Sequence, residues 1–251
     1  MSLDDLPGLR DVPSVTGAQM AEIDRITIDE LGVAVEMLME NASRQIAAAA
    51  RFVLGGVEGK RIIAIAGTGN NGGDALGAAR RLLGWGADAR AVLAAPRERV
   101  RESARRQLEL LARLEVPLAE MTDTGGEVIG ETLAEADLLL DGLLGYSTRG
   151  APRGEVAELI RAANRSGVHI LAVDLPSGLD PDTGTPLGVA IRAMATVTLA
   201  LPKTGLLAPG ARGLVGELLL ADIGIPPVAF GRIGVDTRYL FVDSDLVRIL
   251  R

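Results

Sequence analysis

Residues 61–74 read Arg-Ile-Ile-Ala-Ile-Ala-Gly-Thr-Gly-Asn-Asn-Gly-Gly-Asp, and this stretch decides the fold. Its first six residues are nearly all apolar, as expected for a β-strand that is buried on both faces of a parallel sheet. A glycine-rich turn follows, and the spacing then predicts a helix over residues 74–85. A strand, a tight turn and a helix in this order form the first half of a βαβ unit, so the stretch predicts an α/β protein.

The same alternation continues on both sides of this stretch. Further strands are predicted at residues 89–94, 116–118, 138–141, 169–174, 195–201, 214–221 and 239–242. Further helices are predicted at residues 16–31, 34–54, 98–114 and 155–166. Strands that alternate with helices predict a mostly parallel sheet with right-handed crossovers, closed by extra strands at one edge. No repeat or long linker divides the 251 residues, which we interpret as one domain.

The inventory of reactive side chains excludes several kinds of chemistry. The chain has 26 basic and 33 acidic residues, one histidine (His169) and no cysteine. Disulfides, thiolate zinc sites and cysteine nucleophiles are therefore impossible, and so is a two-histidine metal motif. A Ser-His-Asp triad would have to use His169, which begins a predicted strand and is interpreted as structural. Acid–base work must fall mainly on carboxylates, a lysine or the two tyrosines.

Charge and hydropathy exclude two classes of partner. A net charge of −7 with only six aromatic residues argues against nucleic-acid binding, which favours basic patches interleaved with stacking rings. No apolar run reaches the roughly 18–20 residues of a membrane-spanning helix. The acidic N-terminal segment lacks the basic start and the apolar run of a signal peptide. We therefore expect a soluble cytoplasmic protein.

The glycine turn at residues 67–74 allows three interpretations. Gly67, Gly69 and Gly72 satisfy the dinucleotide fingerprint G-x-G-x-x-G, but the next strand lacks the terminal acid that holds the ribose. Arg97 follows that strand instead, and an arginine there suits a 2′-phosphate. Backbone N–H groups at the helix start can cradle phosphate, although Asp74 would repel it unless its carboxylate points elsewhere. The plainest interpretation is a tight turn in which this aspartate caps the helix.

Two carboxylates end neighbouring buried strands. Asp141 ends the strand at 138–141, and Asp174 ends the strand at 169–174. Open α/β sheets bind their ligands at this carboxyl edge, together with the glycine turn. Either aspartate can act as a general acid or base, supply an oxygen to a hard cation, or simply accept hydrogen bonds from a turn. Lys203 follows another apolar strand and can reach the same edge, although a solvated loop lysine is the simpler interpretation.

Taken together, these motifs resemble the YjeF N-terminal domain family, the NAD(P)H-hydrate (NAD(P)HX) epimerases. The matching pieces occur in the family's order: MENA at 39–42, GNNGGD at 69–74, DGLLG at 141–145, VDLPSGLD at 173–180, TG at 183–184 and LPK at 201–203. The resemblance covers residues 16–226, and it implies a Rossmann-like three-layer α/β/α sandwich that forms a homodimer. It also implies no dehydratase domain in this chain, because only 25 residues follow position 226.

The resemblance implies an activity and a site. The enzyme would interconvert the R and S hydrates of NADH and NADPH for a separate ATP- or ADP-dependent dehydratase, as part of metabolite repair. Asp174 would be the acid–base residue, with Lys203 as a second catalytic candidate. A potassium ion would be held by Asn71, Asp141 and Ser177. The substrate would be lined by Asp174 and by Asn70, Asn71, Gly72, Gly73, Asp74, Gly145, Tyr146, Ser147, Thr148, Arg149, Gly150 and Ala151.

Two other functions stay open on the sequence. Related eukaryotic domains act as dimerisation or protein-binding modules after losing their catalytic residues, and the presence of Asn71, Asp141, Asp174 and Ser177 argues against that loss here. The glycine turn also allows an NAD(P)-dependent oxidoreductase, which would need a proton donor and a nicotinamide pocket that the sequence does not locate. Hydride transfer to NADP would distinguish this oxidoreductase from the epimerase, which leaves the normal cofactor unchanged.

Overall fold

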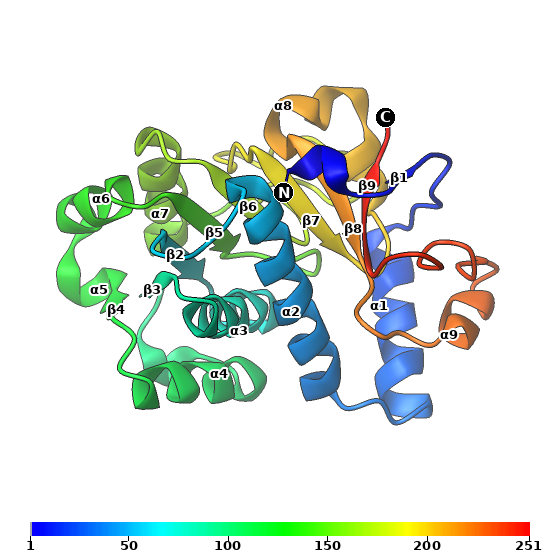
Figure 1. Cartoon of the computed structure of the whole chain (residues 1–251), viewed down its shortest axis with the longest axis horizontal. Coiled ribbons are helices and arrows are strands. Elements are labelled where there is room, and N and C mark those ends of the chain that lie inside the picture. The colour runs from blue at the N-terminus through cyan, green and yellow to red at the C-terminus, as the bar shows by residue number, and fades with distance from the viewer. Residues whose placement is uncertain (1) are drawn as a thin grey trace.

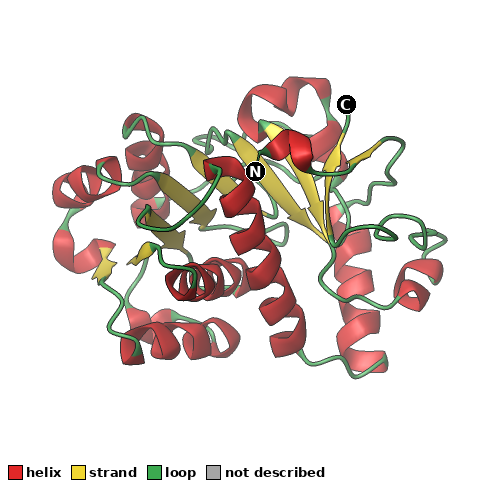
Figure 2. Ribbon diagram, in the orientation of Figure 1, coloured by secondary structure: helices red, strands yellow, loops and turns green. Residues whose placement is uncertain are grey.

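The computed structural model describes residues 2–251, and its centre is one nine-stranded sheet (Figures 1 and 2). The spatial order is β1-β9-β8-β7-β6-β5-β2-β3-β4, and every neighbouring pair is parallel except β8 with β9. The mostly parallel α/β sheet that the sequence predicts is thus confirmed. The strands are β1 (Gly8–Leu9), β2 (Arg61–Ala66), β3 (Asp88–Leu93), β4 (Leu118–Glu120), β5 (Leu138–Gly142), β6 (Ile170–Val173), β7 (Ala195–Leu199), β8 (Glu217–Ala221) and β9 (Leu246–Ile249).

Helices cover both faces of this sheet. Alternate residues of the central strand β2 point to opposite faces: Ala64 packs in the core beneath α2 and α3, and Ile63 packs in the core beneath α6 and α7. Helix α2 crosses in front of the sheet in Figure 1. The helices are α1 (Gly17–Arg25), α2 (Val35–Leu54), α3 (Asn70–Gly84), α4 (Glu102–Arg113), α5 (Met121–Thr124), α6 (Gly126–Ala134), α7 (Gly154–Arg165), α8 (Arg212–Val215) and α9 (Pro227–Gly231).

The glycine turn is shorter than the sequence predicts, because α3 begins at Asn70 rather than at residue 74. The two glycines in its first turn are required by close packing. A Cβ on Gly72 would lie 2.2 Å from the carbonyl oxygen of Gly67, and one on Gly73 would lie 3.0 Å from the Cα of Ala104 in α4. Helix α3 can therefore approach both the end of β2 and α4 only with glycine at these positions.

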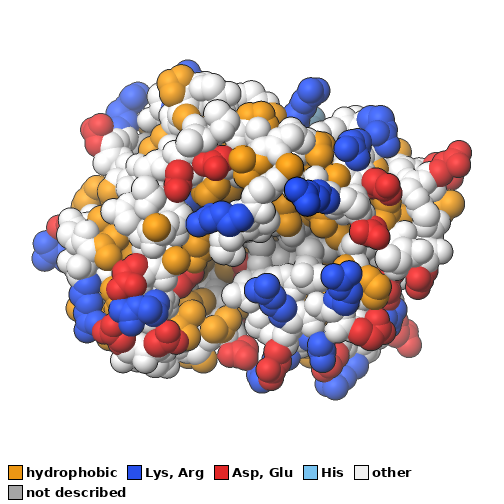
Figure 3. Space-filling view, turned by 180° about the vertical axis from the view of Figure 1, so that it is seen from behind, with side chains coloured by type: hydrophobic (Ala, Val, Ile, Leu, Met, Phe, Trp, Pro, Cys, Tyr) orange, Lys and Arg blue, Asp and Glu red, His pale blue; other side chains and the backbone are white. Residues whose placement is uncertain are grey.

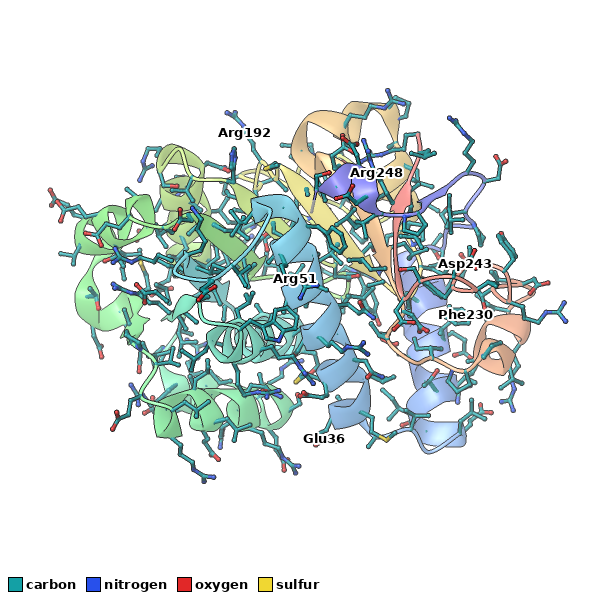
Figure 4. The ribbon with its side chains drawn as sticks, in the orientation of Figure 1. Glu36, Arg51, Arg192, Phe230, Asp243 and Arg248 are labelled. Carbon is teal, nitrogen blue, oxygen red and sulfur yellow. The ribbon has the colours of Figure 1, made fainter. Side chains whose placement is uncertain are left out.

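The C-terminal edge differs from the prediction. Residues 239–242 form turns instead of a strand, and Val242 is 73 % exposed. The last strand is β9, which pairs antiparallel with β8 and parallel with the N-terminal β1. Arg248 of β9 (Figure 4) links the elements at this edge. Its guanidinium forms ion pairs with Asp4 and, at 2.8 Å, with Glu217 of β8. The predicted strand 214–221 is also shortened, because its first residues belong to α8.

On the face opposite to that of Figure 1, no large patch of the described side chains carries charge of one sign only. Positive and negative side chains are mixed over that face, which is hollowed below its centre (Figure 3). Among the described residues, no helix combines the length and the apolar composition needed to cross a lipid bilayer.

Candidate functional site

A cavity of about 430 Å³ lies at the carboxyl edge of the sheet. Its walls come from α1, α2, the first turn of α3, the loop after β5 and the segment after β7. Three carboxylates, one buried lysine and one tyrosine face it, within a partly apolar lining. The lining includes Met20, Asp24, Ile28, Leu38, Met39, Asn70, Asn71, Asp74, Arg101, Gly145, Tyr146, Ser147, Thr148, Asp174 and Lys203.

Asp174 and Lys203 form a buried ion pair in this cavity. The Lys203 ammonium donates a hydrogen bond to Asp174 Oδ1, and a second one of 3.1 Å to the carbonyl oxygen of Leu199. The two residues are only 5 % and 1 % exposed. Lys203 is therefore not the solvated loop lysine of the simpler interpretation. Ion pairs buried this deeply persist where both charges are compensated, as they are here.

Two tight turns with strained backbone position this pair. Asp174 has a φ of 67°, and the N–H of Leu175 donates to the carbonyl of Val173 across it at 2.8 Å. Ala200 repeats the same arrangement at the end of β7, with a φ of 66° and a 2.8 Å bond from Leu201 to Leu199. These are γ-turns of the strained kind that requires positive φ. They turn the chain sharply just where β6 and β7 end at the cavity.

Asp24 is a site residue that the sequence interpretation missed. It lies on α1 four residues after Met20, and Ile28 follows four residues later in the π-helical turn Ile26–Glu30, so that all three line the cavity. The Tyr146 hydroxyl donates a 2.5 Å hydrogen bond to Asp24 Oδ2. Burial raises the pKa of the Asp24 carboxyl, and the bond from Tyr146 opposes that rise. A carboxylate inside an apolar helical stripe was the signal available in the sequence.

Asp74 is the third carboxylate of the cavity, and it does not cap α3. The N-cap is Gly69, so the capping interpretation is wrong. Burial first, and then the charges of Asp174 and Asp24, raise the pKa of Asp74 well above its ordinary value. Within residues 2–251 no hydrogen bond reaches its carboxyl group. A carboxyl group in this setting favours its neutral, proton-donating form.

Of the three residues predicted to bind potassium, Asn71 lines the cavity, whereas Asp141 and Ser177 lie outside its lining. Ser177 donates to Asp141 through its backbone N–H at 2.8 Å and through its hydroxyl at 2.6 Å. The Asn71 amide donates to the carbonyl oxygens of Leu144 and Val173 at 2.9 and 3.1 Å. Burial raises the pKa of Asp141 to about 6, and the hydrogen bonds from Ser177 and from the N–H of Leu143 oppose that rise. No cluster of three or more histidine, cysteine or carboxylate side chains arranged for a metal occurs in the described part of the chain.

The remaining predicted residues divide into two groups. Asn70, Gly145, Ser147 and Thr148 line the cavity, and Asn70 Oδ1 also accepts a 2.7 Å bond from Ser103. Five others lie outside the cavity lining or inside the packed helix: Gly72, Gly73, Arg149, Gly150 and Ala151. His169 is exposed at the start of β6, at the opposite end of that strand from Asp174.

The fold and the cavity define a Rossmann-like α/β protein with a small-molecule site at the carboxyl edge of its sheet. The site supplies carboxylates, a lysine and a tyrosine. The chain belongs to the family described as YjeF-related protein N-terminus, which matches residues 35–205. The resemblance read from the motifs is thereby confirmed.

Individual relatives extend the similarity over nearly the whole chain. An NAD(P)H-hydrate epimerase of Dehalogenimonas lykanthroporepellens is 40 % identical over 95 % of this chain and 93 % of its own length. An NAD(P)H-hydrate epimerase of Pirellula staleyi is 37 % identical over 81 % of this chain and 89 % of its own. A bifunctional NAD(P)H-hydrate repair enzyme of Moorella thermoacetica is 39 % identical over 84 % of this chain, which spans 40 % of that enzyme.

A solved structure has the same fold. The crystal structure of the yeast protein ynu0 superposes with a TM-score of 0.80 at 25 % sequence identity. The match covers 94 % of this chain and 100 % of the yeast chain. The fold is therefore shared over almost the full length.

Proposed function

We propose that this protein is an NAD(P)H-hydrate epimerase, an isomerase that interconverts the R and S hydrates of NADH and NADPH. The single observation that carries the proposal is the 40 % identity to an NAD(P)H-hydrate epimerase along almost all of both chains. The carboxylate-lined cavity at the carboxyl edge supports it, because the reaction moves a proton and a hydroxyl group and transfers no electrons.

Asp174 is our choice for the acid–base residue. Loss of the hydroxyl from the hydrated ring carbon needs a proton on the leaving oxygen, and the ring nitrogen then donates electrons to that carbon. The resulting planar ring carries positive charge, which the Asp174 carboxylate stabilises electrostatically. Lys203 holds the Asp174 carboxylate in place through Oδ1 and thereby sets its orientation.

The substrate-binding segments follow from the cavity walls. Asn70, Asn71 and Asp74 from the first turn of α3 would contact the substrate, together with Gly145, Tyr146, Ser147 and Thr148 from the loop after β5. Gly72 and Gly73 would contribute by allowing the helix start to approach the cavity. Arg149, Gly150 and Ala151 continue the same loop, and we propose that they close over the outer part of a bound dinucleotide.

A potassium ion is proposed at Asn71, Asp141 and Ser177. The donor set fits a monovalent cation, because it offers amide, hydroxyl and carbonyl oxygens around a single carboxylate. Asp141 is fully buried, and the described residues provide no cationic partner for it. When bound, the ion would supply the positive charge that balances Asp141, and it would fix the loop after β6 that begins at Asp174.

The relatives also suggest which partner this chain works with. The bifunctional relatives are named as repair enzymes, and we propose that this chain works with a separate NAD(P)H-hydrate dehydratase. A homodimer and a cytoplasmic location stay predictions from the sequence and its family resemblance. An oxidoreductase is disfavoured, because the epimerase names of the relatives describe no hydride transfer.

The test is to incubate the purified protein with one separated NADHX epimer and to follow the R/S ratio by chromatography. We expect acceleration over buffer, further acceleration by potassium over sodium, and loss of the acceleration in Asp174→Asn. A parallel incubation with NADP and a reductant tests hydride transfer. Equal rates with and without the protein would overturn the epimerase assignment, and an unchanged rate in sodium would overturn the potassium site.

A further inference from the structure

Asp24 is a carboxylate of the cavity that has no role in a reaction in which Asp174 alone is the acid–base residue. It comes from helix α1, whereas Asp174 comes from the end of β6, so two separate elements each deliver one carboxylate. Tyr146 links the two: its hydroxyl donates to Asp24 Oδ2, and its ring centroid lies 5.5 Å from the Lys203 ammonium that holds Asp174. Asp24 Oδ1 forms no hydrogen bond within the described residues and is free to meet a ligand.

Interconversion of the two epimers needs two acid–base groups, one on each face of the nicotinamide ring. If the protein is the proposed epimerase, the ring hydroxyl must change from one face to the other. In one epimer the hydroxyl lies above the ring, and in the other it lies below. A ring held in a cavity cannot turn over between loss and return of water. A proton donor for one face and a proton acceptor for the opposite face are therefore both required.

We propose that Asp24 is the second catalytic acid–base residue, which serves one face of the nicotinamide ring while Asp174 serves the other, and that Tyr146 positions it. In one direction a carboxylic acid protonates the ring hydroxyl, the C–O bond breaks and water departs, leaving a cation that the ring nitrogen stabilises. A water on the other face then forms the new C–O bond and gives its proton to the second carboxylate. The overall step gains and loses one proton and one water, without a redox change.

The surroundings of Asp24 influence both of its protonation states. Met20 of α1 and Ile28 of the turn that follows α1 line the cavity on either side of it in the sequence, and its burial favours the protonated acid. The Tyr146 hydroxyl bond and the nearby charge of Lys203 favour the carboxylate. Burial outweighs these two influences and raises the pKa of Asp24 above its ordinary value, which favours the proton-donating acid.

The experiment separates loss of water from inversion. Each pure NADHX epimer is incubated in ¹⁸O-water with the full chain, and both ¹⁸O incorporation and the R/S ratio are measured, after subtraction of the buffer rates. The wild type should exchange and invert both epimers. In Asp24→Asn we expect inversion to fall roughly 10²–10⁴-fold, while one epimer still exchanges its oxygen without inverting. Asp174→Asn should show the mirror pattern, with exchange retained by the other epimer.

Controls distinguish this role from a structural one. Asp29→Asn removes an exposed carboxylate five residues along the same segment and should match the wild type. Asp24→Asn keeps an acceptor for Tyr146, so its unfolding midpoint should stay close to that of the wild type. Equal loss of exchange from both epimers in either aspartate variant would overturn the second acid–base group, and so would unchanged inversion in Asp24→Asn. A wild type that accelerates neither process would instead refute the epimerase function itself.

Discussion

Removal of the Lys203 charge tests whether the buried pair with Asp174 holds the site together. We choose Lys203→Met, which keeps an unbranched apolar stem in a position that is 1 % exposed and deletes the ammonium. The change leaves Asp174 buried with only the N–H of Leu199, at 3.2 Å, as a donor to its Oδ1. The loss of the pair should therefore destabilise the fold as well as the reaction.

The size of the effect follows from this burial. Removing one partner of a buried ion pair costs about 3–5 kcal/mol of unfolding free energy. Asp174 also lines the cavity, where water can hydrate one side of its carboxylate, so we expect the lower end of that range, about 3 kcal/mol. At roughly 2–4 °C per kcal/mol for a domain of this size, the melting temperature should fall by about 6–12 °C.

A double-mutant cycle gives the decisive measurement. Thermal unfolding is compared for the wild type, Lys203→Met, Asp174→Asn and the double variant, in which neither charge remains. We expect the double variant to be more stable than the sum of the two single losses by about 2 kcal/mol, because no uncompensated charge is left. Additive losses would refute the reasoning, since they would mean that the two side chains stabilise the fold independently. Epimerisation should be impaired in all three variants.

Three further changes test other parts of the structure. Asp74→Asn should stabilise the fold, and by more as the pH rises. Folding raises the pKa of Asp74, so the wild type loses stability as the pH climbs from the ordinary pKa of an aspartate through the raised one. An equal difference in melting temperature between variant and wild type at pH 5 and at pH 8 would contradict this. Ala200→Gly should raise the unfolding free energy by about 0.5–1 kcal/mol in a denaturant titration by relieving the positive φ, and a lower midpoint would argue against strain there. Gly67→Ala should lower the free energy of unfolding by about 3 kcal/mol or more, because its Cβ would lie 2.0 Å from the Leu143 carbonyl oxygen. An unchanged midpoint in the same denaturant titration would contradict this.

The sequence predicts those parts of the fold in which pattern and burial agree. The run at residues 61–66 is apolar because β2 is buried on both faces at the middle of the sheet. Residues 239–242 carry apolar side chains as well, but they form turns in which Leu240 is buried while Tyr239 and Val242 are exposed, and β9 lies a few residues later. Burial of edge strands depends on long-range pairing, here with the N-terminal β1, and no local pattern encodes that pairing.

The site is predictable to a similar extent. Strand-end carboxylates such as Asp174 follow from the rule that parallel sheets bind ligands at their carboxyl edge. Asp24 does not follow from that rule, because it reaches the cavity from a helix that precedes the first central strand. The start of α3 at Asn70 was equally hidden, since two consecutive glycines disfavour a helix locally and only their packing against neighbouring elements explains them.

The strained γ-turn at Asp174 also bears on how sequences of this fold diverge. Glycine in place of Asp174 tolerates the positive φ that costs an aspartate about 1–3 kcal/mol, and an apolar residue in place of Lys203 would then leave no unpaired charge from this ion pair. A lineage released from the need for the reaction therefore gains stability by exchanging both residues, and an aspartate codon becomes a glycine codon through a single base change. The identity of these two positions should thus separate working enzymes from domains that have kept the same architecture for binding alone.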